Sequence, residues 1–324
     1  MAAARCLWFD APGCVAVRAE PLPALRDGQV QVETSFSGIS AGTELLAYRG
    51  QLDPDAVVDE TIGTLGGTFR YPFRYGYSCV GVVERGTAAV PEGTSIFAFQ
   101  PHQDRFVTDA AGVIPLGALD HRQATMFPLV ETALQIALDA GPVLDERVIV
   151  FGLGAVGLLT SLVLQRAGAA VVAAEPRDWR RQLAHGLGVE AAAPEELSTE
   201  PPVALVIEAS GSPDALRAAL PLLAHEGTAL VASWYGTKPV ELPLGAAFHR
   251  RRLTIRSTQV STIPANLTDR WSPERRRQAA VELLGELPLA ALASHTYPFD
   301  DPAAAYAAVD AGTSGLMHAA LGYR

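Results

Sequence analysis

Residues 148–157 read Val-Ile-Val-Phe-Gly-Leu-Gly-Ala-Val-Gly, and this stretch decides the fold of the chain. A run of apolar residues leads directly into the pattern G-x-G-x-x-G, and a helical pattern follows over residues 158–166. This order predicts a strand, a tight turn and the start of a helix whose N-terminus faces the phosphates of a dinucleotide. Gly152 permits the turn, Gly154 lets the backbone approach a pyrophosphate, and Gly157 lets helix and strand pack closely. The contacts predicted for this turn are Gly152, Gly154, Ala155, Val156 and Gly157.

An acidic residue follows the next predicted strand. That strand covers residues 170–174 and leads into Glu175, where a carboxylate would bind the ribose hydroxyls of the dinucleotide. Its negative charge would repel a 2′-phosphate, which favours NAD(H) as the cofactor. Arg177 and Arg180 lie just beyond, and a swing of Arg177 would accommodate such a phosphate. NADP(H) therefore stays open as the alternative.

Length and composition indicate a globular chain of two domains. The 324 residues are 49% hydrophobic and 19% charged, which permits a large core and exceeds one ordinary domain. The net charge of -10 argues against a nucleic-acid partner, and no run of about 18 apolar residues predicts a membrane span. The first residues lack the pattern of a secretory signal, and the three cysteines form no CxxC pair, so we expect a cytoplasmic protein. The single lysine, Lys238, among abundant arginine and alanine indicates a GC-rich bacterial genome.

The hydrophobic pattern changes near residue 120. Before it, short β-type runs such as Gln29–Glu33, Cys79–Val83 and Ser95–Phe99 alternate with turn residues, which predicts a barrel-like β domain. After it, a helix over Gln123–Asp139 and successive β-α units predict a parallel sheet with helices on both faces. The strands expected there are 148–151, 170–174, 204–207, 229–232 and 253–256; a helix at 273–284, a strand at 294–299 and a helix at 302–309 follow.

The order of these parts resembles the medium-chain dehydrogenase/reductase superfamily over nearly the whole chain. Residues 38–44, Gly-Ile-Ser-Ala-Gly-Thr-Glu, are similar to the family segment G-I-C-G-T-D with one residue inserted, and residues 75–83 are similar to G-H-E-x-x-G-x-V. Residues 128–133 and 294–299 resemble the family's linking helix and closing strand. The resemblance implies an α/β fold with a GroES-like β-barrel catalytic domain and a Rossmann domain with a doubly wound, six-stranded parallel sheet. The boundaries we expect are 1–119 for the first part of the catalytic domain, 120–262 for the Rossmann domain and 263–324 for the return.

The resemblance also implies further contacts and an assembly. The segment Ser210-Gly-Ser212 follows the fourth Rossmann strand and would border the adenosine half of the cofactor. Ser233 and Trp234 follow the fifth strand and would approach the nicotinamide or the substrate, and the backbone at Thr258 would receive the carboxamide. In the family the last strand, here residues 253–256, pairs with its counterpart in a second subunit, so we expect a homodimer.

The positions that hold catalytic zinc in many members of the superfamily differ here. The matching residues are Ser40, Tyr77 and Phe127, none of which is a usual zinc ligand, and the four-cysteine structural lobe is absent from the sequence. We therefore expect a zinc-free site. A metal would require His102 and Glu131 to meet in space.

Several polar residues are candidates for proton transfer in a site without zinc. Tyr77 lies where the family keeps a zinc-binding histidine facing the nicotinamide, and a phenol donates a proton to a developing oxyanion. Thr43 matches the hydroxyl of the family's proton relay, and Ser40 borders the same loop. His102 is a second acid/base candidate, and Glu131 begins the linking helix. A structural alternative stands beside each role: a core aromatic for Tyr77, a turn hydroxyl for Thr43, a buried histidine for His102 and a helix-start acid for Glu131.

Three functions fit this pattern. The first is zinc-independent hydride transfer between NAD(P)(H) and an alcohol/carbonyl pair of a small molecule. It is favoured because Gly-Ile-Ser-x-Gly-Thr-Glu with Gly-Tyr-Ser is most similar to bacteriochlorophyllide dehydrogenase-like proteins, which oxidise a hydroxyethyl side chain. The second is reduction of an activated double bond, as in zinc-free quinone and enoyl reductases. The third is a non-catalytic nucleotide-binding protein, against which the retained polar groups at positions 40, 43, 77 and 102 argue.

Overall fold

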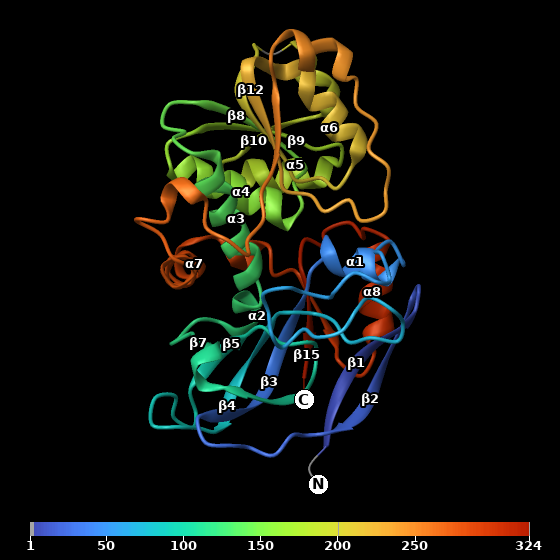
Figure 1. Cartoon of the computed structure of the whole chain (residues 1–324), viewed down its shortest axis with the longest axis vertical. Coiled ribbons are helices and arrows are strands. Elements are labelled where there is room, and N and C mark those ends of the chain that lie inside the picture. The colour runs from blue at the N-terminus through green and yellow to red at the C-terminus, as the bar shows by residue number, and fades with distance from the viewer. Residues whose placement is uncertain (1–2, 200, 324) are drawn as a thin grey trace. The chain divides into compact units, whose positions relative to one another are not determined.

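A computed structural model describes residues 3–199 and 201–323, which divide into two compact units (Figure 1). The β unit contains residues 1–128 and 284–324, and the nucleotide unit contains residues 129–283. The expected division placed the boundaries earlier, at 119/120 and 262/263. The segment 263–283 groups with the nucleotide unit because its helix is joined there to the linking helix by a buried ion pair between Arg276 and Glu131.

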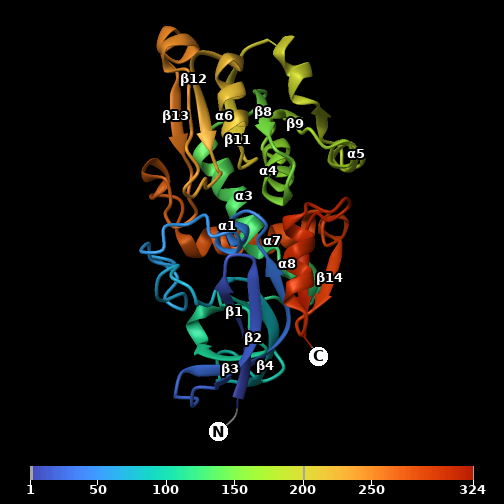
Figure 2. The same cartoon turned by 90° about the vertical axis from the view of Figure 1, so that its right-hand side faces the viewer.

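The nucleotide unit is built on a six-stranded parallel sheet in the order β10-β9-β8-β11-β12-β13. Figure 2 shows β12 and β13 side by side at one edge of this sheet. The strands are β8 (Arg147–Phe151), β9 (Ala170–Ala174), β10 (Glu190–Ala192), β11 (Val203–Glu208), β12 (Leu223–Val231) and β13 (Thr254–Ser257). The helices are α3 (Phe127–Ala140), α4 (Ala155–Arg166), α5 (Asp178–Gly186), α6 (Pro213–Ala219) and α7 (Pro273–Glu286).

The apolar run that opens the glycine turn is buried on both faces of the sheet. Val148 and Val150 pack into one hydrophobic cluster, while Ile149 and Phe151 pack into the cluster on the opposite face. Side chains alternate between faces along a strand, so a strand covered on both sides needs an apolar residue at every position. This double burial explains why β8 reads as an unbroken apolar stretch.

The β unit contains a seven-stranded sheet and a separate two-stranded ribbon. The sheet runs β14-β15-β3-β4-β5-β7, with β6 paired to β3, and the ribbon joins β1 to β2. The last, red part of the chain therefore joins the blue strands, because β15 pairs with β3 (Figure 1). The strands are β1 (Ala3–Ala11), β2 (Cys14–Pro21), β3 (Gln29–Ile39), β4 (Cys79–Arg85), β5 (Ser95–Ala98), β6 (Arg105–Asp109), β7 (Val113–Pro115), β14 (His295–Pro298) and β15 (Ala319–Gly322). The helices are α1 (Thr43–Tyr48), α2 (His121–Ala124) and α8 (Pro302–Asp310).

One expected helix is interrupted. The sequence predicts a single helix over residues 123–139, whereas the structure has α2 at 121–124 and α3 from Phe127 onward. Pro128 has no N–H to donate to the carbonyl four residues earlier, which breaks the helical ladder at this point. The hydroxyl of Thr125 instead donates to the carbonyl of Arg122 at 2.6 Å and closes the short helix.

Candidate active site and nucleotide pocket

A pocket of about 460 Å³ lies in the nucleotide unit, beside the glycine turn. Its walls include six of the residues predicted to bind the cofactor: Gly152, Gly154, Glu175, Arg177, Arg180 and Ser210. Ser212, from the same predicted segment as Ser210, also lines it, as does Asp214, which the sequence analysis did not select. Asp214 follows β11 as Ser210 does, and side chains just beyond the carboxyl ends of parallel strands lie where such folds bind ligands. That positional rule could have identified it.

The glycine turn has the geometry that close approach requires. Gly152 has a φ of 92°, and a Cβ there would stand 2.6 Å from the Cα of Ser210. A Cβ on Gly157 would stand 1.9 Å from the carbonyl oxygen of Gly152, so helix α4 packs directly on the turn. A Cβ on Gly154, by contrast, would meet nothing within 4 Å and would project into open space. Gly154 also lines the pocket, and a pyrophosphate fits the space that the missing side chain leaves.

Glu175 is fixed at the end of β9. Its side chain accepts a hydrogen bond from the backbone N–H of Leu153 at 2.8 Å and another from the N–H of Arg177 at 3.0 Å. A carboxylate has further lone pairs, so it retains capacity to accept ribose hydroxyls. Arg180 approaches the same carboxylate at 3.6 Å, and its buried Nε has no hydrogen-bond partner among the described residues. Burial lowers the pKa of Arg180. The unpartnered Arg180 Nε beside the Glu175 carboxylate is suited to a ligand that supplies a hydrogen-bond acceptor.

The remaining predicted cofactor contacts lie outside the lining of this pocket. Ala155 and Val156 form the first turn of α4. The hydroxyl of Ser233 accepts the N–H of Gly211 at 2.8 Å, and Trp234 is 48% exposed. Thr258 donates its hydroxyl to Asp139 at 2.6 Å. Their predicted contacts with a bound dinucleotide stay predictions.

In the β unit, the structure brings Tyr77, Ser40 and Thr43 together. Tyr77 is partly buried, its ring lies edge-on to Tyr75 at 6.0 Å between centroids, and side-chain hydrogen bonds link its phenol to Ser40 and Thr43. Burial and the charge of Glu44 raise the pKa of Tyr77 to about 12, although the two hydroxyl donors act in the opposite direction. Three side chains predicted as catalytic candidates therefore meet at one oxygen atom.

A buried polar network lies behind this cluster. Glu44 and His102 are both 0% exposed, and His102 donates from Nε2 to the Glu44 carboxylate at 2.9 Å. The other ring nitrogen of His102 is hydrogen-bonded to the hydroxyl of Ser37 at 2.7 Å. Glu44 also accepts the hydroxyl of Tyr306 at 2.5 Å. Both ring nitrogens of His102 are thus engaged, so the histidine supports the site from within and does not face a ligand.

Glu131 belongs to the nucleotide unit. It is 3% exposed and pairs with the buried Arg276 on α7 at 3.1 Å. Burial raises the pKa of Glu131, and the nearby Arg276 guanidinium opposes that shift. Arg276 also donates to Gln135 at 2.5 Å. These contacts join α3 to α7, and the Glu131 carboxylate is engaged by them.

The three positions that correspond to zinc ligands hold groups with other contacts. Phe127 is fully buried against Phe97, with 4.6 Å between ring centroids, while Ser40 and Tyr77 belong to the hydroxyl cluster. Within residues 3–199 and 201–323, no three His, Cys, Asp or Glu side chains are grouped so that they could hold a metal ion. No helix in this part of the chain is long and apolar enough to cross a bilayer.

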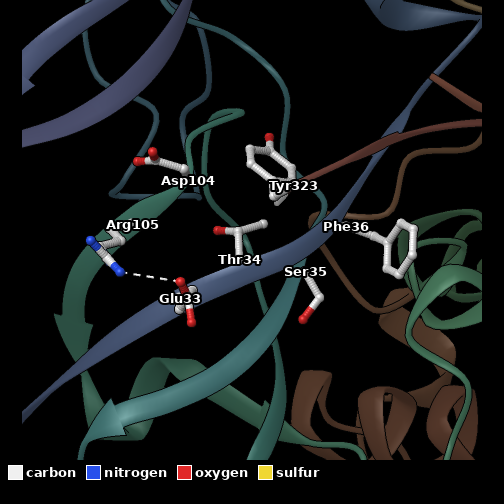
Figure 3. A pocket seen from close by; sticks show the side chains of 7 residues that line it. All are labelled: Glu33, Thr34, Ser35, Phe36, Asp104, Arg105 and Tyr323. Carbon is white, nitrogen blue, oxygen red and sulfur yellow. Dashed lines mark hydrogen bonds and ion pairs between the residues drawn. The ribbon is translucent and has the colours of Figure 1, made fainter. Parts of the chain in front are cut away.

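A second pocket of about 310 Å³ lies in the β unit (Figure 3). Its charged side chains already have partners: Arg105 pairs with Glu33 at 3.1 Å, and Asp104 pairs with Arg5 at 2.7 Å. Tyr323, which also lines this pocket, is hydrogen-bonded through its hydroxyl to Ser37 at 2.7 Å. The Thr34 hydroxyl in the same lining has no hydrogen-bond partner among the described residues. A single neutral hydroxyl does not define a ligand, so we assign the pocket none.

Comparison with known proteins agrees with this geometry. The family model described as zinc-binding dehydrogenase matches residues 155–274, a range that lies wholly in the nucleotide unit. The chain is 29% identical over 311 residues to the 2-desacetyl-2-hydroxyethyl bacteriochlorophyllide A dehydrogenase of Cereibacter sphaeroides, with 89% of this chain and 87% of the relative covered. It is 24% identical to the D-guloside 3-dehydrogenase of Escherichia coli, with 81% and 82% covered.

A solved structure extends the comparison. The crystal structure of a short chain alcohol dehydrogenase from Escherichia coli CFT073, complexed with NADH, superposes with a TM-score of 0.78 at 17% identity and covers 99% of both chains. The fold of the whole chain is that of the medium-chain dehydrogenase/reductase superfamily, and its nucleotide unit matches a dehydrogenase family model. These matches support an NAD(P)-dependent oxidoreductase.

Proposed function

We propose that this protein transfers hydride between NAD(H) and an alcohol/carbonyl pair without catalytic zinc, with Tyr77 as the proton donor or acceptor. The observation that carries the proposal is the cluster at the Tyr77 phenol, to which the side chains of Ser40 and Thr43 are both hydrogen-bonded. Ser40 and Tyr77 occupy positions where zinc-dependent members have ligands, and a phenol held by two donors supplies proton chemistry in their place.

The chemistry of the cluster follows from its hydrogen bonds. When bound, the nicotinamide supplies or accepts the hydride. In carbonyl reduction the Tyr77 phenol gives its proton to the substrate oxygen, and the donors Ser40 and Thr43 stabilise the phenolate that remains. Oxidation of an alcohol requires the reverse transfer to an ionised phenol. We assign Glu131 no proton transfer because its carboxylate is paired with Arg276.

The preference for NAD(H) rests on the Glu175 carboxylate. It is 3% exposed and held by two backbone N–H groups, so its charge cannot swing away from an incoming 2′-phosphate. Arg177 is exposed on the pocket wall, and Arg180 is held near Glu175. NADP(H) binding would require these arginines to outweigh the fixed carboxylate.

Two relatives support a hydroxyl or carbonyl substrate over an activated double bond. The bacteriochlorophyllide dehydrogenase and the D-guloside dehydrogenase are both named for dehydrogenation. The free thiols of Cys6, Cys14 and Cys79 favour a reducing compartment such as the cytoplasm. The substrate we propose is a small molecule, and the assembly we propose is a homodimer.

Replacement of the phenol tests the proposal. A screen of ketones and enones by the loss of NADH absorbance identifies a substrate, and preferential turnover of enones would favour double-bond reduction instead. Tyr77→Phe keeps the ring and should lower kcat by ~100- to 1000-fold, the effect of losing one oriented donor to an oxyanion, with NADH affinity unchanged. Thr43→Val should give a smaller loss.

Tyr75→Phe is the matched control, because it removes a hydroxyl from the neighbouring ring of the same aromatic cluster. Its kcat should stay near the parental value. If Tyr77→Phe retained more than half of the parental kcat, Tyr77 would be a packing residue and the proposed mechanism would be wrong. Stoichiometric zinc in the purified protein together with loss of turnover on chelation would contradict the zinc-free reaction.

A further inference from the structure

We infer that Glu44 and His102 form a buried clamp that holds the Tyr77 phenol against its donors Ser40 and Thr43, so that both are positioning residues for proton transfer. This inference rests on the role proposed for Tyr77. It starts from an arrangement in which two separate segments of the β unit, one carrying Ser40 and Thr43 and the other carrying Tyr77, are each joined to the same buried pair.

Glu44 holds the segment that carries the donors. One of its oxygens accepts the backbone N–H of Ser40 at 2.8 Å, and its own backbone N–H donates to the Ser40 carbonyl at 3.0 Å. These two bonds close a loop around residues 40–44, which contains both hydroxyls that reach Tyr77. A change in the position of the Glu44 carboxylate would therefore move Ser40 directly.

His102 holds the segment that carries the phenol. Its backbone N–H donates to the carbonyl of Tyr75 at 3.2 Å, and its ring lies directly on Gly76, where an added Cβ would stand 2.4 Å from the ring. Gly76 has a φ of 95°, a backbone conformation that favours glycine. The imidazole is thus packed on the peptide that immediately precedes Tyr77, and its Nε2 is bonded to Glu44.

The clamp is itself fixed from outside. Tyr306 on α8 donates to the same carboxylate oxygen of Glu44 as His102 does. On the far side of the imidazole, Ser37 bonds Nδ1 and is in turn bonded to Tyr323. Every side-chain group of this buried network has a partner, which is the condition under which a buried polar network rigidifies a site.

Packing alone does not explain why a buried carboxylate occupies position 44. Taking a carboxylate out of water is costly, and well-packed apolar residues are often equal or better for stability than a buried charged pair. An apolar residue at position 44 could fill the same volume, but it could not accept the N–H of Ser40 or the Nε2–H of His102. The benefit of the pair is therefore the fixed distance between Tyr77 and its donors.

A double-mutant cycle separates positioning from structural support. Glu44→Gln should lower kcat roughly tenfold while the NADH dissociation constant stays unchanged, because the amide fits the space but disturbs the bond to His102. The same change in a Tyr77→Phe background should cause no further loss, since no phenol remains to be positioned. Tyr306→Phe, which removes one bond to Glu44 and keeps the ring, should lower kcat a few fold and likewise lose its effect in that background.

The outcomes distinguish this inference from the proposed function. Suppose that Tyr77→Phe has a low kcat, and that Glu44→Gln and Tyr306→Phe each lower kcat equally in the parental protein and in the Tyr77→Phe variant. This result would overturn the clamp and leave the proposed function standing. No loss for either variant in the parental protein would also overturn it. A near-normal kcat for Tyr77→Phe would overturn the proposed function, and the clamp with it. If Glu44→Gln failed to fold, the Tyr306→Phe pair of measurements would decide.

Discussion

At the scale of single residues, the environment of Tyr77 predicts which direction of the proposed proton transfer is easier. Its pKa of about 12 is raised by burial first and by the charge of Glu44 second, with a smaller contribution from Asp59. Tyr75, which is also titratable, packs against its ring. The phenol is therefore protonated, and ready to act as an acid, throughout the pH range in which proteins are usually assayed.

This environment predicts different pH profiles for the two directions. Because reduction uses the protonated phenol, its kcat should be nearly constant from about pH 6 to pH 10. Oxidation uses the ionised phenol, so its rate should rise about tenfold per pH unit over the same range. Initial rates in both directions would check this, with Tyr77→Phe as the control that should lose the slope. A plateau in the oxidation rate near neutral pH would contradict it.

A second residue, His318, predicts how the stability of the protein changes at acid pH. Burial lowers the pKa of His318 to about 4, and its Nε2 lies 3.0 Å from the hydroxyl of Thr125. That hydroxyl donates its hydrogen to the carbonyl of Arg122, so Nε2 must be the donor to Thr125. The neutral ring is favoured in the folded state, and the stabilisation is present above the unfolded pKa of about 6.5 and lost as pH falls toward 4.

We expect His318 to account for a loss of about 3 kcal/mol in the free energy of unfolding between pH 6.5 and pH 4. Urea unfolding at several pH values would measure it. His318→Gln keeps an N–H donor without the titration, so its stability should depend less on pH over this interval. An unchanged pH dependence in that variant would assign the acid sensitivity to other groups.

At the scale of elements, the turn between β8 and α4 predicts how substitutions change the affinity for the cofactor. Gly154→Val would fill the open space at the pocket wall that a pyrophosphate fits, so binding of NADH and NADPH should both be abolished. Glu175→Ala should weaken NADH selectively, by a few kcal/mol at most. Isothermal titration would test both, and tighter NADPH than NADH in the parental protein would reverse the cofactor preference.

The buried pair between α3 and α7 predicts a large effect on stability. Arg276→Met removes the closer of two cations at the buried Glu131 carboxylate and leaves Arg277 at 3.8 Å, so the cost in the free energy of unfolding should approach about 3–5 kcal/mol. Arg275→Met changes the neighbouring, exposed arginine and should cost less than about 1 kcal/mol. Thermal or urea unfolding of the two variants would compare them. Equal, small losses would show that the pair contributes little.

These elements also show what the sequence can reveal. The β-α order and the glycine turn were predictable because apolar runs and glycine spacing are local, and β9 was found at its predicted bounds. The break before α3 was missed because a helical pattern of apolar residues continues through Pro128. Arg276 and Glu131 stand 145 residues apart, and only the packing of two helices brings them together.

The residues of the candidate site likewise divide into those that the sequence could identify and those that it could not. Ser40, Thr43 and Tyr77 could be selected because each lies in a segment that resembles a family motif. Tyr306 could not, since its bond to Glu44 spans 262 residues and its own helix carries no motif. The burial of His102 was equally hidden, because one histidine before a strand has the same sequence context whether it faces a ligand or the core.

At the scale of the whole molecule, the edge of the nucleotide sheet predicts an assembly. Among the residues that the structure describes, β13 pairs with β12 along one side only, and three of its four residues are exposed. An uncovered edge strand readily pairs with another strand, and two-fold pairing closes the assembly. We expect a homodimer, with a mass by light scattering twice the 34.2 kDa of the chain. A stable monomer at micromolar concentration would contradict this expectation.

The return of the chain to the β unit also sets an order of events during synthesis. The nucleotide unit is one continuous segment and can fold as soon as it leaves the ribosome, whereas the β unit waits for β15 and Tyr306. At translation rates of about 5–20 residues per second, the 178 residues between positions 128 and 306 take roughly 10 to 35 seconds. During that interval the nascent β3 lacks its β15 neighbour, and Glu44 lacks the hydrogen bond from Tyr306. The newborn chain should therefore acquire nucleotide affinity before catalytic competence, and the unfinished β sheet should be the segment that molecular chaperones shield.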